Sequence, residues 1–256
     1  MPINPTEILA RFVANAKYED LPDQALALGR SSLLDASGTG LAGSASKGAK
    51  ALNSVLESYA SMDGTPVIGT NIRLPAPFAA MANGNSINSD DFDDTLRADP
   101  NAEGYHGSTH PSGPLLSALM ALTDKRKVNG RDFQIAYHVG MELMAKINSA
   151  LGPRSFSAGF HPTAIMSAFG ATAAAAKIKG LSEENIATSL GICASHACGL
   201  RANFGSMMKP YHPGHGAMSG LLAAEMAEGG ITASEDAIGG DIGFLNAYGD
   251  SIDIRP

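Results

Sequence analysis

The chain has 256 residues, a formal net charge of -7 and a pI near 5.4. Nucleic-acid-binding proteins usually display a basic patch, so this acidic chain is not expected to bind nucleic acid. Apolar residues make up 44% of the chain but aromatic residues only 6%, and Trp is absent. This composition favours closely packed helices over a β-sandwich, whose strands are rich in branched and aromatic residues.

Cysteine content and apolar patterning indicate a cytoplasmic protein without a membrane partner. Cys193 and Cys198 lie in one predicted helix and are too few for a disulfide framework. The first residues contain neither the charged region nor the apolar region of a secretory signal. The apolar run from Ala164 to Ala176 is too short and too rich in Gly and Ala to span a bilayer, so we expect a buried helix there.

Helical signals run along most of the chain. Asn4 and Pro5 open a first helix in the order of a cap followed by proline, and further helices are predicted from about Pro22 to Gly43 and from Lys47 to Met62. The segment from Thr65 to Leu74 is rich in β-branched residues and predicts a short strand or hairpin. Later helices are predicted at about Pro77 to Ile87, Gly113 to Lys125, Asn129 to Leu151, Pro162 to Lys179, Ser182 to Cys198 and Gly214 to Glu228.

The tail from Thr232 begins with a short helical turn and is then expected to be Gly-rich and extended. No internal repeat or low-complexity linker divides the chain. The predicted fold is therefore all-α: a large, irregular helical bundle with a small β-hairpin excursion, forming a single domain over residues 1–256.

A first chemical cluster consists of four Asp residues between positions 90 and 94, followed by Thr95, His106 and His110. Such a run is either a well-solvated loop or a site where basic partners hold some of the carboxylates. The spacing does not match the calcium-binding loop, and histidine is a poor ligand for hard cations. No metal is expected at this cluster.

Two further clusters place basic side chains near predicted helix starts. His161 precedes Pro162, and a helix N-terminus binds anions and disfavours the imidazolium, so His161 is a candidate neutral base as well as a candidate capping residue. Lys209 and His212 lie before the next predicted start, and Lys209 and Arg201 would complement substrate carboxylates. A His-Pro pair thus recurs at three predicted helix starts, at His110, His161 and His212, which favours a shared site.

Two other patterns are better explained without a ligand. Cys193, His196 and Cys198 lack the fourth ligand and the paired spacing of a zinc site. Gly38 to Gly40 with Gly43 is similar to a phosphate loop, but no strand precedes it and no G-K-[ST] follows it. Close helix packing accounts for these glycines.

Four segments together resemble the MmgE/PrpD family: D-F-D-D-T, H-P-S-G-P, G-F-H-P-T-A and K-P-Y-H-P-G-H-G-A-M. The similarity runs over essentially the whole chain, in the order and spacing of the family. The resemblance implies a large helical domain, a smaller α/β lid domain, a homodimer, and a site between domains that works without metal or organic cofactor. The family includes 2-methylcitrate dehydratase, cis-aconitate decarboxylase and iminodisuccinate epimerase.

Carried over by motif, the implied site residues are Asp91, Thr95, His110, His161 and Lys209. His212 lies within the same matched segment as Lys209 and is added as a substrate-binding residue. The expected roles are His161 as base or proton donor, His110 as its partner, and Lys209 as a carboxylate ligand. Asp91 and Thr95 would orient His110 or a substrate hydroxyl. The expected activity is that of a lyase, most simply a hydro-lyase like 2-methylcitrate dehydratase, acting on a small di- or tricarboxylate.

The sequence departs from the family pattern in two places. The segment from Leu96 to Thr109 is longer than the link associated with the decarboxylase and lacks the Trp-Leu-Ala run of the dehydratase, so dehydration, decarboxylation and epimerisation all stay open. The family chain also continues into the lid, which we expect to be missing after Pro256. The chain is then either a subunit that works with a separate lid polypeptide or a relative that binds carboxylates without turning them over.

Overall fold

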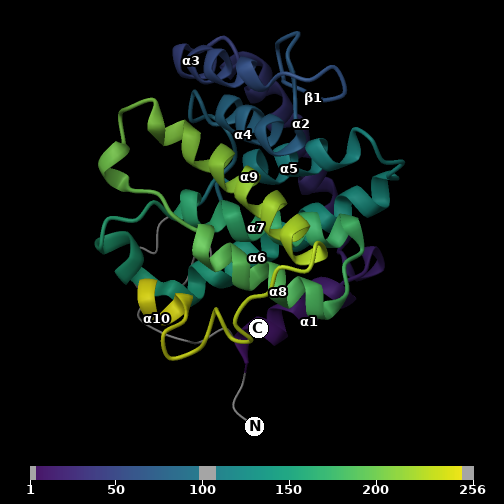
Figure 1. Cartoon of the computed structure of the whole chain (residues 1–256), viewed down its shortest axis with the longest axis vertical. Coiled ribbons are helices and arrows are strands. Elements are labelled where there is room, and N and C mark those ends of the chain that lie inside the picture. The colour runs from purple at the N-terminus through teal and green to yellow at the C-terminus, as the bar shows by residue number, and fades with distance from the viewer. Residues whose placement is uncertain (1–3, 98–107, 250–256) are drawn as a thin grey trace.

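The computed structural model describes residues 4–97 and 108–249, and Figure 1 shows these residues as one bundle of helices. The helices and strands are α1 (Pro5–Asn15), α2 (Asp23–Gly43), α3 (Lys47–Leu56), β1 (Thr65–Pro66), β2 (Arg73–Leu74), α4 (Ala76–Ile87), α5 (Ser112–Thr123), α6 (Gly130–Ser157), α7 (Pro162–Lys179), α8 (Glu183–His196), α9 (Met208–Glu228) and α10 (Phe244–Tyr248). Short 3₁₀ turns lie at η1 (Tyr18–Asp20), η2 (Glu57–Tyr59) and η3 (Arg201–Asn203). The predicted all-α class is confirmed, and so is the hairpin, in which antiparallel β1 and β2 pair Thr65 with Leu74.

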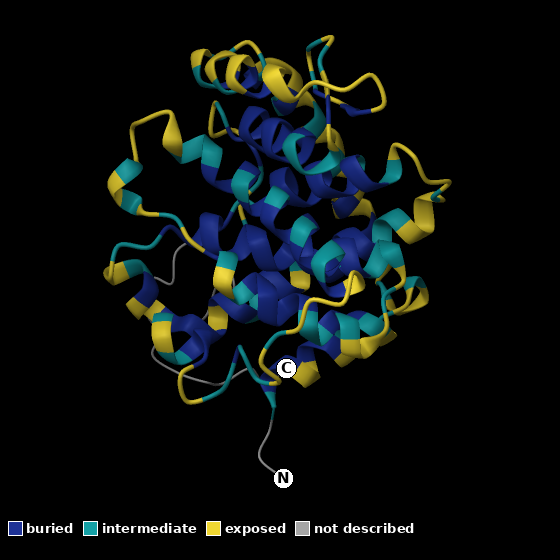
Figure 2. Ribbon diagram, viewed as in Figure 1, coloured by how far each residue is buried: buried dark blue, intermediate teal, exposed yellow. Residues whose placement is uncertain are grey.

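The centre of the bundle is α7, which is surrounded by α5, α6, α8 and α9. Every residue from Pro162 to Ala176 is buried, as expected for a helix that is apolar on all sides. Figure 2 shows the buried residues concentrated in this middle region, whereas α3 and the outer loops are largely exposed. The start of α7 is therefore fixed deep inside the fold, which gives the residues around it a rigid setting.

Glycines allow α9 to lie close to both α4 and α7. A Cβ atom added at Gly214 would lie 2.2 Å from the carbonyl oxygen of Met81 in α4, and one added at Gly220 would lie 2.5 Å from the backbone nitrogen of Thr172 in α7. Nothing but hydrogen fits in either place. The same holds for Gly43 of α2, where a Cβ would lie 2.0 Å from the carbonyl oxygen of Ser86, so the close packing predicted for that glycine is confirmed. The same prediction is wrong for Gly38, because a Cβ added there would have nothing within 4 Å.

Several helix boundaries that a cap or a proline marks agree with the predictions. The Asn4 and Ser182 side chains cap α1 and α8 by accepting hydrogen bonds from Glu7 and Asn185, and α7 has the predicted bounds. The predicted end of α6 at Leu151 coincides with a kink, because Gly152 has φ 60° and ψ -165° before the helix resumes at Pro153.

The predicted start of α9 at Gly214 is wrong. The helix begins at Met208, so Pro213 lies inside it rather than at its start. A proline in a helix lacks the N–H that would donate to the carbonyl four residues earlier, here that of Lys209. As a result, His212 lies in the second turn of a helix and does not precede one.

The tail also differs from the prediction of an extended segment. After a series of turns it forms α10, in which Phe244 and Leu245 are buried and the Phe244 ring lies 4.7 Å from that of Phe169 in α7. These apolar side chains draw the tail back onto the core, because their burial removes apolar surface from water. Within the described residues no helix is long and apolar enough to cross a membrane. His106 lies outside the described residues.

Candidate active site

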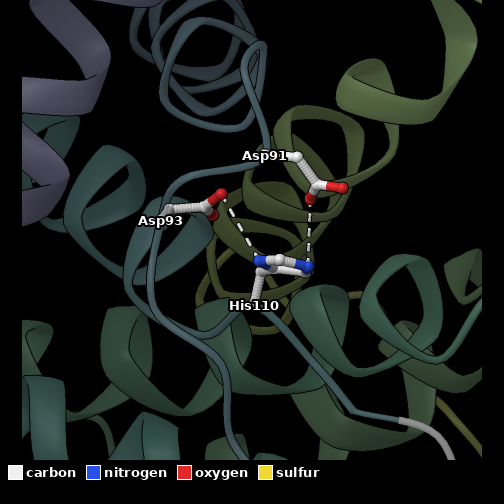
Figure 3. Close-up of side chains that lie close together, drawn as sticks. All are labelled: Asp91, Asp93 and His110. Carbon is white, nitrogen blue, oxygen red and sulfur yellow. Dashed lines mark ion pairs between the residues drawn. The ribbon is translucent and has the colours of Figure 1, made fainter.

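The loop that follows α4 folds around the imidazole of His110 (Figure 3). Its Nε2 lies 3.2 Å from Asp91 Oδ1, and its Nδ1 lies 3.3 Å from Asp93 Oδ1. The Asp93 side chain is completely buried, whereas that of Asp91 is 59% exposed. Of the two alternatives for the acidic run, basic partners holding the carboxylates is therefore the one seen for Asp91 and Asp93.

The two carboxylates change the acidity of His110. Burial by itself lowers the pKa of His110, and so does the nearby ammonium of Lys209, but the close contact with the negatively charged Asp93 carboxylate, together with the charge of Asp91, outweighs both. The pKa of His110 is therefore raised above its usual value of 6.5. A histidine in this state is suited to donate a proton near neutral pH.

Asn88, at the end of α4, joins the acidic loop to α9. Its Nδ2 donates hydrogen bonds to both carboxylate oxygens of Asp93, at 2.8 and 3.0 Å, and its Oδ1 accepts one from Lys209 Nζ at 3.1 Å. Lys209 also forms an ion pair with Asp91. One amide thus holds a lysine on one side and a buried carboxylate on the other, and the acidic loop, α9 and His110 form one network.

The backbone of the acidic loop is shaped to make these contacts. Asp91 has φ 59°, the only positive φ among the described residues other than glycine. A non-glycine residue in this region costs on the order of 1–3 kcal/mol, a cost that surrounding contacts must offset. Here the Asp91 carboxylate reaches both Lys209 and His110.

Asp94 anchors the far side of the loop on the start of α5. Its carboxylate accepts hydrogen bonds from the backbone N–H of Ser112 at 3.2 Å and from the Ser112 hydroxyl at 2.6 Å, and the same hydroxyl lies 2.6 Å from the Tyr137 hydroxyl. Burial raises the pKa of Asp94, although the bonds from Ser112 oppose the shift. Anchored at both ends, the loop holds His110 in one position.

His161 and His212, called here the histidine pair, form a second group within the electrostatic reach of Lys209. His161 is the N-terminal cap residue of α7, His212 comes from α9, and their Nδ1 atoms are 2.9 Å apart. Only 4% of His161 and 5% of His212 is exposed. Burial, the partner imidazole and Lys209 lower the pKa of His161 to about 3, and burial, His215 and Lys209 lower the pKa of His212 to about 4. Both rings are therefore neutral at pH 7.

The two halves of the site meet at the start of α7. The backbone N–H of His110 donates to the Thr163 hydroxyl, at 3.2 Å, in the first turn of the helix that His161 caps. The positive charge of Lys209 lowers the pKa of His110, His161 and His212 alike, so all three imidazoles lie within its electrostatic reach. The pKa values of these histidines are thus shifted in opposite directions around one ammonium group. This arrangement is expected where an acid and a base act together on an anion.

Comparison with known proteins identifies the family of the chain. The family model of the MmgE/PrpD N-terminal domain matches residues 7–256. The chain belongs to the MmgE/PrpD family. Human cis-aconitate decarboxylase is 32% identical over 249 residues, which are 95% of this chain and 50% of the human protein.

Two other relatives of the MmgE/PrpD domain carry the same name. The mouse cis-aconitate decarboxylase is 30% identical and matches 95% of this chain and 49% of its own length, and that of Aspergillus terreus is 26% identical and matches 95% and 50%. The chain therefore spans about half the length of the curated relatives it matches.

Most of the site residues predicted for this MmgE/PrpD domain are joined by direct contacts, and the other two, Thr95 and Arg201, are not part of this set of contacts. Asp91, His110, His161, Lys209 and His212 form the site described above. Thr95 is exposed, and within the described residues no hydrogen bond joins its hydroxyl to His110. Its role in orienting His110 or the substrate stays a prediction.

Arg201 has partners of its own. Its guanidinium stacks on the Phe156 ring, 3.5 Å from the ring centroid, and Nη1 donates to the Phe156 carbonyl at 2.9 Å. Its Nε is buried without a hydrogen-bond partner. Arg201 thus ties η3 to the end of α6, and its positive charge also contributes to the lowered pKa of His161. Carboxylate binding by Arg201 stays a prediction.

Sequence reasoning missed Asn88 and did not single out Asp93. Asn88 is 1% exposed and Asp93 is 4% exposed, so both are strongly buried polar residues of the kind that require specific partners. The available signal was the position of Asn88, at the predicted end of a helix and immediately before the acidic run. An amide there can cap the helix or hold a carboxylate, and the sequence does not say which.

Asp91, Asp93 and His110 also form a group whose ligand atoms lie within 4.8 Å of one another, a spacing that suits a metal ion. The Lys209 ammonium, however, already pairs with the Asp91 oxygen that faces His110. A divalent cation bound to that oxygen would be repelled by the half-buried ammonium of Lys209. The geometry therefore favours Lys209 as the cation of this cluster.

The cysteine pattern does not form a comparable group. Cys193 is completely buried, and burial raises the pKa of its thiol to about 12, which opposes the thiolate that zinc requires. Cys198 is exposed, and both cysteines are free. In the part of the chain that the structure describes, no metal-ligand group includes either one.

Proposed function

We propose that the chain supplies the helical-domain part of a lyase active site for a small tricarboxylate or related acid. The observation that carries the proposal is that the charge of one lysine, Lys209, acts both on a histidine with a raised pKa, His110, and on a buried histidine with a lowered pKa, His161. Lyase reactions of polycarboxylates develop negative charge on carbon next to carboxylates. They therefore need a fixed cation for the carboxylates and separate groups to give and take protons.

The proposed roles follow from the environments of the side chains. Lys209 binds a substrate carboxylate, because its ammonium is fixed by Asn88 and Asp91 and is only 14% exposed. His110, whose pKa is raised by its two carboxylates, is the proton donor. His161 is neutral and is the base. Asp91 orients His110.

Decarboxylation of a cis-aconitate-like acid is the first candidate reaction, because the relatives described above are named cis-aconitate decarboxylases. In this reaction the C–C bond to a carboxylate breaks, CO₂ leaves, and the electron pair stays on carbon, where His110 protonates it. Only a proton donor and an anion-binding cation are needed, and His110 and Lys209 would supply both.

Dehydration without a cofactor is the second candidate, and the histidine pair favours it. A hydro-lyase removes a proton from carbon with a base while an acid protonates the leaving hydroxyl group. A buried histidine with a pKa of about 3 that stays neutral at pH 7 suits the base, which decarboxylation does not require. A 2-methylcitrate dehydratase-like activity therefore remains part of the proposal.

We also propose that another polypeptide segment covers the site. Four large apolar side chains beside the site are exposed: Phe92 by 81%, Met207 by 55%, Phe204 by 47% and Met208 by 43%. An apolar cover would exclude water and strengthen the charge interactions around Lys209. A lid polypeptide or the partner subunit of a homodimer would supply it.

The test is a panel of di- and tricarboxylates followed by NMR in D₂O, with and without a lid polypeptide. Turnover of cis-aconitate with loss of CO₂ supports the first candidate, and loss of water from a 2-hydroxy tricarboxylate supports the second. In an active assembly, His161→Gln should lower kcat by ~100-fold or more if dehydration is the reaction. His138→Gln is the matched control, since His138 is a partly buried histidine that pairs with Gln134 outside the site.

Saturable binding without turnover, lost on Lys209→Met, would contradict the lyase proposal. The chain would then be a carboxylate-binding relative of the family.

A further inference from the structure

The contact within the histidine pair restricts where its protons lie. The two Nδ1 atoms are 2.9 Å apart, the length of a hydrogen bond, and the rings are tilted by 51° with centroids 5.1 Å apart. A neutral imidazole has one N–H, so one Nδ1 donates and the other accepts. The two rings consequently have opposite tautomers: one has a free lone pair on Nε2, and the other has a proton there.

Further imidazoles continue from the pair along α9 and α8. His215 follows His212 by three residues on the same helix, and the two influence each other electrostatically, as do His215 and His196 at the end of α8. His196 Nδ1 is buried and has no hydrogen-bond partner. Cys198, two residues further on, is exposed. A series of four histidines thus runs from the buried start of α7 toward the surface at the end of α8.

We infer that His212 is a positioning residue for His161: it fixes the tautomer with a free Nε2 on His161 and relays protons away from it. The relay rests on the proposed function, whereas the tautomer of His161 does not depend on it. When His161 Nε2 takes a proton from a substrate C–H group, the electron pair of that bond stays with the substrate. The Nδ1 proton of His161 passes to His212 Nδ1, and the Nε2 proton of His212 leaves toward His215. His161 is neutral before and after the transfer.

The charges around the pair explain why a relay is needed. The groups that oppose a positive charge on His161 are Lys209 and His212 from α9, His110 from the loop before α5, and Arg201 from η3. His212 faces Lys209 and His215, and His215 faces His196. A proton held on His161 is thus surrounded by positive or neutral basic groups in a buried setting, where charge is costly. Passing it outward removes that cost.

NMR of the full chain with ¹⁵N-labelled histidine tests the tautomer without a substrate. We expect a scalar coupling between the Nδ1 atoms of His161 and His212 across the shared hydrogen bond, with the proton on Nδ1 of His161 and on Nε2 of His212. In His212→Leu the coupling disappears and His161 shows a mixture of tautomers. Protons on Nε2 of both rings, or no coupling in the unaltered chain, would overturn the inference.

Kinetics in an active assembly test the relay. In His212→Asn the amide can still hydrogen-bond to His161 Nδ1 but cannot carry a proton, so we expect an unchanged KM and a kcat lowered by ~100-fold. The kcat of this variant should also rise with pH where that of the unaltered protein is flat. His138→Asn is the control and should change neither the His161 spectrum nor kcat. A His212→Asn variant with unaltered kcat and pH profile would refute the relay. If the assembly is inactive on every acid, the proposed function is refuted instead, and the NMR experiment still decides the tautomer.

Discussion

Replacing Asn88 by Ala removes the amide that connects Lys209 to Asp93. A hydrogen bond to a charged group contributes about 1.5–3 kcal/mol, and a buried partner left without one loses most of that amount. The Asp93 carboxylate is completely buried and receives both bonds from Asn88 Nδ2. Lys209 keeps Asp91 as a partner, so its loss is smaller. We expect Asn88→Ala to lower the free energy of unfolding by about 2–4 kcal/mol.

Urea unfolding followed by circular dichroism measures the loss. The matched control is Asn53→Ala, which removes the same atoms from a residue that is 6% exposed and whose Oδ1 has no hydrogen-bond partner. The control should lose at least about 1 kcal/mol less than Asn88→Ala. Equal losses for the two variants would show that burial alone, and not the network, gives Asn88 its importance.

Three other predictions follow from the geometry. Asp93→Asn should lower the pKa of His110, because burial and the charge of Lys209 lower this pKa and the negative charge of Asp93 no longer raises it. NMR titration measures the pKa, and an unchanged value would refute the role of Asp93. Because the pKa of His110 is raised, protonated His110 stabilises the fold fully below pH 6.5, and this stabilisation is lost as the pH rises through the raised pKa. The lowered pKa values of the histidine pair have the opposite effect: they destabilise the fold as the pH falls from 6.5 toward about 4. Urea midpoints should therefore decrease on the acid side, and less so in His212→Asn; an equal decrease in both would contradict this. Gly220→Ala should lose stability because its Cβ would lie 2.5 Å from backbone, whereas Gly38→Ala, with nothing within 4 Å, should gain up to about 1 kcal/mol; thermal unfolding that ranks them the other way would contradict the packing of α9.

The fold could be predicted from local signals because caps, prolines and apolar runs act on their own neighbourhood. The bounds of α7 follow from Pro162 and from the polar lysines at its end, and the hairpin follows from its β-branched residues. The start of α9 could not be predicted in this way. Pro213 normally indicates a helix start, and only tertiary packing of the glycine-rich face on α4 and α7 holds the helix through it.

The chemical residues of the site were largely predictable, but their partners were not. The recurring His-Pro pairs and Lys209 indicated a shared site, yet Asn88 and Lys209 are 121 residues apart, and the members of the histidine pair are 51 apart. Contacts over such separations depend on how helices pack, which no local pattern of residues encodes. The opposite shifts in acidity of His110 and His161 arise from those contacts and therefore became visible only in the structure.

The central claim is that one half-buried lysine, Lys209, acts on histidines whose pKa values are shifted in opposite directions. A ¹H–¹⁵N NMR titration of the full chain, with His110, His161 and His212 assigned by single substitutions, tests it most directly. We predict that His110 titrates above pH 6.5, while His161 and His212 stay neutral until the pH falls to about 4. Three titrations grouped around pH 6.5, each insensitive to Lys209→Met, would contradict the claim.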